Sequence, residues 1–120
     1  MKSVLIVEPD EPLAALLELV LQEDGYTITL AHNLDEARDI LCRSHFDAII
    51  TEAFNQGNLF SFDPRFLSDL QAAAGNTPIV LCSTDTYALG LRTGDFGLAD
   101  VISKPLDIDD LPRKMRKVTG

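Results

Sequence analysis

The sequence predicts an α/β fold in which helices cover both faces of a parallel β-sheet. Short runs of small or branched apolar residues, such as 47–51, recur along the chain and are typical of strands that are buried on both faces. Between these runs lie longer segments in which apolar residues follow the spacing of a helix with one buried face. Alternating strands and helices favour a parallel sheet, because right-handed crossovers then connect each strand to the next.

Five strands and five helices are expected, and together they define the class. The strands are expected at 3–7, 26–30, 47–52, 78–82 and 100–103. The helices are expected at 13–24, 34–41, 64–74, 85–96 and from about 109 onward. This is a flavodoxin-like (βα)5 fold, a three-layer sandwich whose five-stranded parallel sheet has the strand order 2-1-3-4-5.

Turn and capping residues support the first three helices. Gly25 suits the C′ position that closes the first helix. Asn33, with Glu36 three positions later, resembles a capping box at the start of the second helix. Asp63 and Pro64 supply an N-cap and an N1 proline for the third helix, whereas the turn-rich segment 55–58 before it predicts a loop.

The last two helices contain residues that weaken helices. Gly90 and Gly94 each cost about 1 kcal/mol relative to alanine, so the helix at 85–96 is expected to be the least stable one. Pro112 would remove a backbone hydrogen bond from a helix capped at Asp107. A helix that starts near Asp109 keeps the proline within its first turn, so we expect a late start.

Composition and charge limit the function. The chain of 120 residues is expected to form one domain, 1–120, and its net charge of −9 argues against nucleic-acid binding by this domain, because phosphate contacts need a basic surface. No apolar run approaches the about 18 residues of a membrane span, and no signal peptide precedes the first strand. A cytoplasmic location without membrane contact is therefore expected. The basic run 113–117 suits the last turn of a helix; a docking patch for an acidic partner is the alternative.

Cysteine and histidine offer little chemistry. Cys42 and Cys82 both lie in apolar patterns without a CxxC partner, which predicts buried free thiols. His32 and His45 are expected on the surface, away from the carboxyl edge of the sheet. We therefore expect neither histidine to take part in the site.

Polar residues gather where the expected strands end. Glu8, with Asp10 just beyond, follows the first strand, and Glu52 ends the third. Ser83 follows the fourth strand and Lys104 the fifth. In open α/β sheets, ligands bind at the carboxyl ends of the strands. Carboxylates can hold Mg²⁺ there, while a hydroxyl and an ammonium group can receive phosphoryl oxygens.

Four motifs in this order resemble the receiver domain of two-component response regulators over essentially the whole chain. They are 4–8 (Val-Leu-Ile-Val-Glu), 47–52 (Asp-Ala-Ile-Ile-Thr-Glu), 77–83 (Thr-Pro-Ile-Val-Leu-Cys-Ser) and 97–105 (Gly-Leu-Ala-Asp-Val-Ile-Ser-Lys-Pro). The resemblance implies that Glu52 stands at the phospho-acceptor position, that Ser83 is the switch hydroxyl and that Lys104 pairs with the phosphate or carboxylate. Glu8 and Asp10 would form the acidic pocket.

The chain departs from the family pattern at three positions. Glu52 replaces the phospho-accepting aspartate, Pro9 stands where the second acid of the metal-binding pair is expected, and Val101 replaces a frequent aromatic residue. An extra methylene moves a carboxylate by about 1 Å, and a displacement of that size can cost about a hundredfold in rate. The resemblance thus indicates an atypical member, a pseudo-receiver that is not phosphorylated at the usual position.

The sequence leaves three interpretations of Glu52 open. Its carboxylate could partly replace an acyl phosphate by pairing with Lys104 and so favour an active-like state. It could instead form a partly exposed ion pair worth about 0–1 kcal/mol, without any switching. The third interpretation is a weak Mg²⁺ site built from Glu8, Asp10 and Glu52.

The resemblance predicts a regulatory domain that acts in signal transduction by a two-component phosphorelay. We expect the domain not to be an enzyme and to require no cofactor. Its partner is expected to be a signalling kinase or an effector protein, bound through the face formed by the fourth helix, fifth strand and fifth helix; a homodimer is also compatible with the sequence. Two other functions stay open: a phosphorylation-competent, Mg²⁺-dependent receiver, and a small flavodoxin-like binder of nucleotides or other ligands. The second is disfavoured because the chain has neither a P-loop nor a G-x-G-x-x-G motif.

Overall fold

The structure, a computed structural model, describes residues 2–52, 54–55, 58–62, 64–83, 98–103 and 110–119. A parallel sheet of five strands forms its centre, with the order β2-β1-β3-β6-β7. These strands are β1 (Ser3–Val7), β2 (Thr27–Ala31), β3 (Ala48–Thr51), β6 (Ile79–Ser83) and β7 (Asp100–Ser103). Counted within this sheet alone, the order is 2-1-3-4-5, as the sequence predicts.

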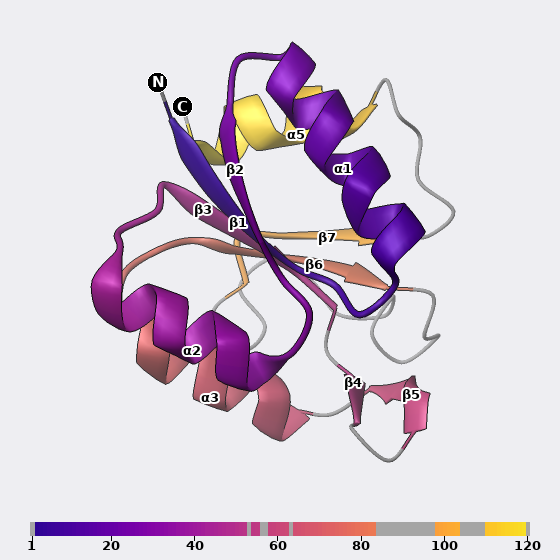
Figure 1. Cartoon of the computed structure of the whole chain (residues 1–120), viewed down its shortest axis with the longest axis vertical. Coiled ribbons are helices and arrows are strands. Elements are labelled where there is room, and N and C mark those ends of the chain that lie inside the picture. The colour runs from indigo at the N-terminus through magenta and orange to yellow at the C-terminus, as the bar shows by residue number, and fades with distance from the viewer. Residues whose placement is uncertain are drawn as a thin grey trace.

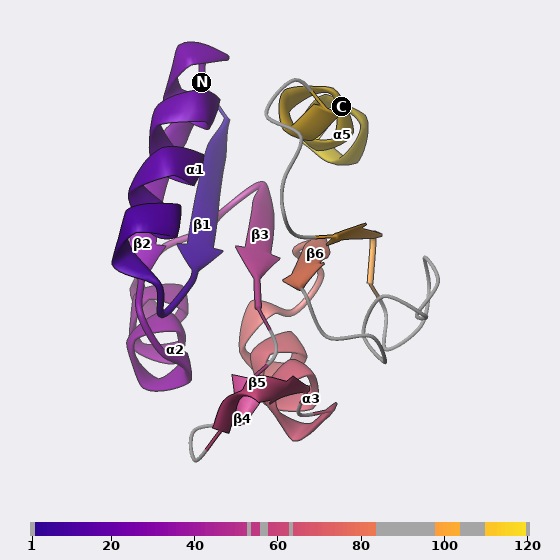
Figure 2. The same ribbon diagram turned by 90° about the vertical axis from the view of Figure 1, so that its right-hand side faces the viewer.

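Helices cover both faces of this sheet, which gives three layers. They are α1 (Glu11–Glu23), α2 (Leu34–Arg43), α3 (Pro64–Ala74) and α5 (Asp110–Thr119). Figures 1 and 2 show α1 and α5 on one side of the sheet and α2 and α3 on the other. The expected helix at 85–96 lies outside the described residues.

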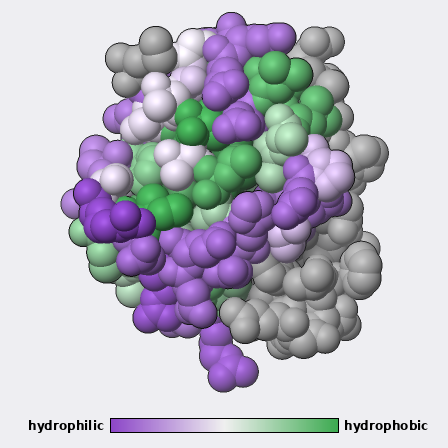
Figure 3. Space-filling model, in the orientation of Figure 1, coloured by the Kyte–Doolittle hydropathy of each residue, from purple (hydrophilic) through white to green (hydrophobic). Residues whose placement is uncertain are grey.

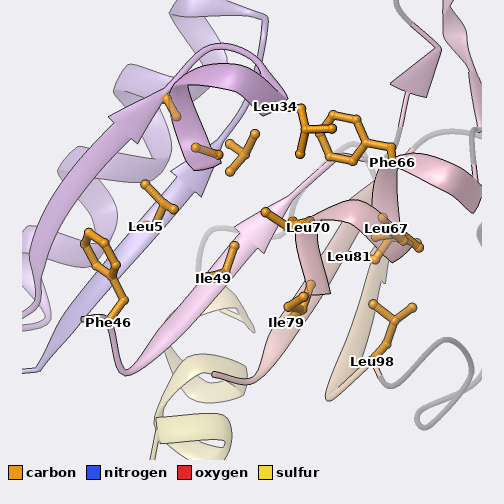
Figure 4. Close-up of a cluster of buried hydrophobic side chains, with 13 residues drawn as sticks. Leu5, Leu34, Phe46, Ile49, Phe66, Leu67, Leu70, Ile79, Leu81 and Leu98 are labelled. Carbon is orange, nitrogen blue, oxygen red and sulfur yellow. The ribbon is translucent and has the colours of Figure 1, made fainter. Parts of the chain in front are cut away.

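Each face of the sheet contributes to its own hydrophobic cluster. Successive side chains of a strand point to opposite faces, so Leu5 and Val7 of β1 join one cluster while Val4 and Ile6 join the other. The cluster under α2 and α3 is drawn in Figure 4, where Phe66 is among the labelled side chains. Buried strands of this kind have no polar face, which explains their continuous apolar runs.

Local hydrogen bonds fix where the first two helices begin. The Leu13 N–H donates to Asp10 Oδ1 at 3.2 Å, so α1 starts at Glu11, earlier than predicted. Asn33 caps α2, since its side chain accepts from the Glu36 N–H at 2.8 Å. The other half of the predicted capping box differs, because Glu36 Oε2 accepts from the His32 N–H at 2.6 Å instead.

Glycines with positive φ follow two of the helices. Gly25 (φ 98°) lies after α1 and Gly75 (φ 65°) after α3, in a conformation that other residues rarely adopt. The prediction that Gly25 closes the first helix is therefore confirmed.

Two local predictions were wrong. A short antiparallel pair, β4 (Phe54–Asn55) and β5 (Asn58–Phe62), lies where the sequence predicts no strand, and residues 56–57 of the expected loop at 55–58 lie outside the described residues. Aromatic residues favour strands, and the sequence of β5 is rich in them. Cys42 is exposed rather than buried, while Cys82 is buried as expected. The reason is that Ile40 and Leu41, not Cys42, cover the hydrophobic core at the end of α2.

The last helix starts at Asp110, so Pro112 lies within its first turn, as the sequence predicts. Leu111 and Met115 anchor the helix in the core. Three of its four basic residues pair with acids of the chain itself: Arg113 and Lys114 with Asp110, and Arg116 with Asp24. Arg116 and Lys117 lie in the last turn of the helix, as the first interpretation of the basic run expects, while the docking patch stays a prediction.

In the described part of the chain, each helix is too short or too polar to cross a bilayer.

Candidate functional site

Two buried carboxylates lie at the carboxyl edge of the sheet. Glu8 follows β1 and is 3% exposed; Glu52 follows β3 and is 8% exposed. Val7 and Thr51, the residues before them, are partners in the parallel register of β1 and β3. The Glu52 N–H also donates to the Val7 carbonyl oxygen at 3.2 Å. The fold therefore brings the two glutamates to neighbouring strand ends.

The third predicted acid of the pocket, Asp10, has a different local role. It is exposed, and its carboxylate accepts the Leu13 N–H at the start of α1. Its own N–H donates to Glu8 Oε2 at 3.2 Å. Asp10 thus holds the Glu8 side chain through its backbone, while its carboxylate faces the helix.

Thr51 is a member of the site that the sequence analysis did not single out. It is fully buried, and its hydroxyl donates to the carbonyl oxygen of Glu52 at 2.9 Å. A buried hydroxyl needs a partner, and this one fixes the backbone where the strand ends. Its position in the sequence could have indicated this role, because Thr51 is the only hydroxyl residue in the otherwise apolar strand β3.

The magnesium site predicted from Glu8, Asp10 and Glu52 does not fit this arrangement. Among the described residues, no group of three or more His, Cys, Asp or Glu side chains is placed so as to hold a metal ion. Asp10 Oδ1 accepts the Leu13 N–H at the start of α1, which directs this carboxylate towards the helix.

Ser83 and Lys104 complete the predicted site, and the structure describes them only in part. Ser83 ends β6, and its backbone is in register with Ser103 at the end of β7. The Ser83 backbone thus lies at the same edge of the sheet as Glu8 and Glu52. The side chain of Ser83 and the whole of Lys104 lie outside the described residues.

His32 also lies at the carboxyl edge, so the prediction that placed it elsewhere was wrong. The cause is that β2 extends to Ala31, which puts His32 directly after the strand. Its Nδ1 lies 3.3 Å from Glu36 Oε2 and its Nε2 lies 4.0 Å from Glu11 Oε1. The pKa of Glu36 is lowered, mainly by the hydrogen bond from the His32 backbone N–H and to a smaller extent by the contact with the His32 side chain. All three side chains are exposed, as is His45, which precedes β3 as expected.

Nearly the whole chain matches known proteins. The family model for the response regulator receiver domain matches residues 4–116. The chain is 29% identical over 114 residues to the uncharacterized transcriptional regulatory protein YkoG of Bacillus subtilis. The aligned residues cover 94% of this chain and 49% of that protein. It is 30% identical over 122 residues to the response regulator ArlR of Staphylococcus aureus, covering 98% and 52%. The chain therefore spans about half the length of these curated relatives.

Solved structures show the same fold. The receiver domain of the Francisella response regulator 1452 has a TM-score of 0.82 at 22% identity, covering 99% of this chain and 97% of that one. The receiver domain of the sensor histidine kinase PA1611 from Pseudomonas aeruginosa has a TM-score of 0.79 at 22% identity, covering 99% and 98%. That structure holds a magnesium ion in its active site cleft.

Proposed function

Because this chain belongs to the response regulator receiver domain family, we propose that it is a pseudo-receiver, a regulatory domain of two-component signalling that is not phosphorylated at the usual position. Its role is to bind other proteins rather than to catalyse a reaction. The observation that carries this proposal is Glu52, a buried glutamate at the end of β3.

Geometry is the first support. Phosphoryl transfer depends on in-line placement of the attacking oxygen, and a shift of about 1 Å can lower the rate by about a hundredfold. A glutamate in place of an aspartate adds a methylene between the backbone and the carboxylate. Two hydrogen bonds hold the Glu52 backbone, one from the Thr51 hydroxyl and one to the Val7 carbonyl oxygen. The backbone is therefore not expected to shift back and offset the longer side chain.

Charge is the second support. Pro9 occupies the position where the resemblance places a second metal-binding acid, and the next acid along the chain, Asp10, caps α1. A divalent cation at this edge would thus rely on Glu8 and Glu52. Mg²⁺ helps phosphoryl transfer by neutralising charge on the oxygens, so the loss of one acid lowers the rate in addition to the geometric effect.

Receiver domains of response regulators interact with kinases and effector domains. We place the partner surface of this chain at β7, α5 and the segment 85–96, where the sequence predicts the fourth helix; this is the surface expected from the family resemblance. A kinase or an effector protein, or a second copy of the chain, would bind there. Leu111 and Met115, the two buried residues of α5, hold that helix against the core.

Intact-mass measurement tests the proposal. The wild-type chain is incubated with Mg²⁺ and a small phosphodonor such as acetyl phosphate, next to the variants E52D and P9D/E52D. We expect no stoichiometric phosphoryl adduct on the wild-type chain and an adduct on P9D/E52D, which restores both acids. That double variant shows that the donor, the metal and the rest of the pocket are functional.

The competing function is an orthodox Mg²⁺-dependent receiver. A stoichiometric adduct mapped to Glu52 of the wild-type chain, formed within minutes, would establish it and refute the pseudo-receiver. An adduct on neither the wild type nor P9D/E52D would show that the deficit lies elsewhere in the pocket, and would refute the argument from Glu52 and Pro9.

A further inference from the structure

Strand β2 lies at one edge of the central sheet, next to β1. Edge strands are usually protected by a lysine, a proline or a bulge, because their open backbone groups attract other strands. β2 has none of these: its sequence is Thr-Ile-Thr-Leu-Ala, and its register with β1 is continuous. Thr27 is exposed and residues 28–30 are half-buried, and Figure 3 shows hydrophobic residues at the surface in the region where Figure 1 has β2. The edge is therefore uncharged and accessible.

The hydrogen bonds between β1 and β2 show which backbone groups point away from the sheet. The Thr27 N–H donates to the Lys2 carbonyl oxygen at 2.9 Å, and the Ala31 carbonyl oxygen accepts at the same distance from the residue that follows β1. In a parallel strand, the N–H and C=O of one residue point to one side and those of the next residue to the other. The odd-numbered residues of β2 thus face β1 with their backbone groups, whereas Ile28 and Leu30 face outward.

The outward N–H groups just beyond the two ends of β2 are used within the chain. The Tyr26 N–H donates to the Leu21 carbonyl oxygen at 3.1 Å, and the His32 N–H donates to Glu36 Oε2 at 2.6 Å. For the two outward residues between them, the part of the chain that the structure describes offers no such partner. Two N–H and two C=O groups therefore stay open at this edge, where water or another strand must satisfy them.

These four open groups match those of a second copy of the same strand. When two β2 strands run antiparallel about a two-fold axis beside Thr29, Ile28 of each copy lies opposite Leu30 of the other. Each of these two pairs exchanges two hydrogen bonds between N–H and C=O, so all four open groups of each copy find a partner. Thr29 then faces Thr29 of the other copy as the non-hydrogen-bonded pair between them.

The charges at the two ends of β2 also suit this arrangement. Lys2 and Arg116 lie at its amino end, where Arg116 pairs with Asp24. Glu11 and Glu36 lie at its carboxyl end, beside the residue that follows the strand. An antiparallel pair sets the amino end of one copy against the carboxyl end of the other, which brings cations towards carboxylates. The two-fold axis supplies this complementarity twice, and this favours a second copy over a strand of another protein.

We infer that two copies of this chain associate through their β2 edges, so that two sheets of five strands form one continuous sheet of ten. The contact consists mainly of backbone hydrogen bonds along one short strand, so the association is weak and depends on concentration. This inference goes beyond the proposed function, because it concerns a different surface and does not depend on the chemistry of Glu52.

Sedimentation velocity of the full chain tests the inference. Protein concentrations extend to about 1 mM, where weak complexes are populated. A salt concentration of about 0.15 M screens the net charge of −9 on each copy beyond about 8 Å. T29K and T29E each place like charges against one another at the axis, which destabilises a strand pair. T29V is the neutral control at the same position, and circular dichroism checks that each variant is folded.

The wild type and T29V are expected to dimerise, while T29K and T29E each raise the dimer dissociation constant at least tenfold. An equal mixture of T29K and T29E should recover the dimer, because opposite charges then meet at the axis. A wild type that stays monomeric overturns the inference in favour of a strand of another protein. A dimer that all variants form equally well overturns it in favour of another face, and a monomeric mixture of folded variants overturns it as well.

Disulfide cross-linking provides a second readout that introduces no charge. The Cα atoms of a non-hydrogen-bonded antiparallel pair lie about 4.5 Å apart, within the range of a disulfide. T29C/C42S, which lacks the exposed Cys42, should therefore form a covalent dimer under mild oxidation. The wild type, which keeps Cys42 on α2, is the control. Cross-linking of T29C/C42S no faster than that of the wild type would overturn the inference.

Discussion

A carboxylate at the edge of this sheet can act as a metal ligand or as a helix cap, and the structure gives Asp10 the role of helix cap. Its Oδ1 accepts the Leu13 N–H at 3.2 Å, with the extended backbone that an N-cap requires. Removing such a cap costs about 1 kcal/mol. We therefore expect D10A to lower the free energy of unfolding by about 1 kcal/mol.

The asparagine variant provides the matched control. D10N keeps an oxygen that can accept the same hydrogen bond and loses only the charge near the helix N-terminus, which is worth about 0.5 kcal/mol. An unfolding entropy of about 2.1 cal/mol/K per residue converts 1 kcal/mol into about 4 °C for this chain of 120 residues. D10A should thus melt about 4 °C below the wild type and D10N about half as far below.

Urea and thermal unfolding, followed by circular dichroism, measure both variants with and without Mg²⁺. Any rise in the melting temperature that Mg²⁺ causes in the wild type should survive in D10A, because the cap and not the metal holds this carboxylate. The reasoning fails if D10N unfolds as easily as D10A, or if D10A alone removes the effect of Mg²⁺.

Three further predictions concern the rest of the structure. T51V removes the buried hydroxyl that donates to the Glu52 carbonyl oxygen, and urea unfolding should show a free energy of unfolding lower by about 1 kcal/mol. A variant as stable as the wild type would show that this hydrogen bond does not stabilise the fold. M115A leaves a cavity beneath α5 and should cost about 2–5 kcal/mol; a loss below about 1 kcal/mol would mean that the helix does not depend on this anchor. The lowered pKa of Glu36 means that its contribution to stability is present above the ordinary value of 4.5 and is lost as the pH falls through the lower, folded-state value. An NMR titration of H32A should recover only part of that shift, because the backbone N–H of residue 32 is its largest cause, and full recovery would contradict this order of causes.

The architecture could be predicted from patterns that are local in sequence. Continuous apolar runs mark strands that are buried on both faces, and Asn33 and Gly25 mark helix ends through hydrogen bonds and φ values that depend on neighbouring residues alone. Even the late start of α5 followed from the missing N–H of Pro112. The pairing of β4 with β5 was not predicted, because the turn residues at 55–58 indicate a reversal of the chain but not how far the flanking residues pair.

Side-chain roles at the site depended on contacts between segments that are distant in sequence. The sequence by itself determined that Glu8 and Glu52 end neighbouring strands, because strand order and the carboxyl ends of strands follow from the βα alternation. Only the tertiary structure decided that Asp10 turns to α1, that His32 lies at the same edge of the sheet, and that Leu16 and Leu19 are left outside the core. The physical reason is that a pattern specifies which residues share a face, whereas the packing of helix on sheet specifies which of those faces is covered.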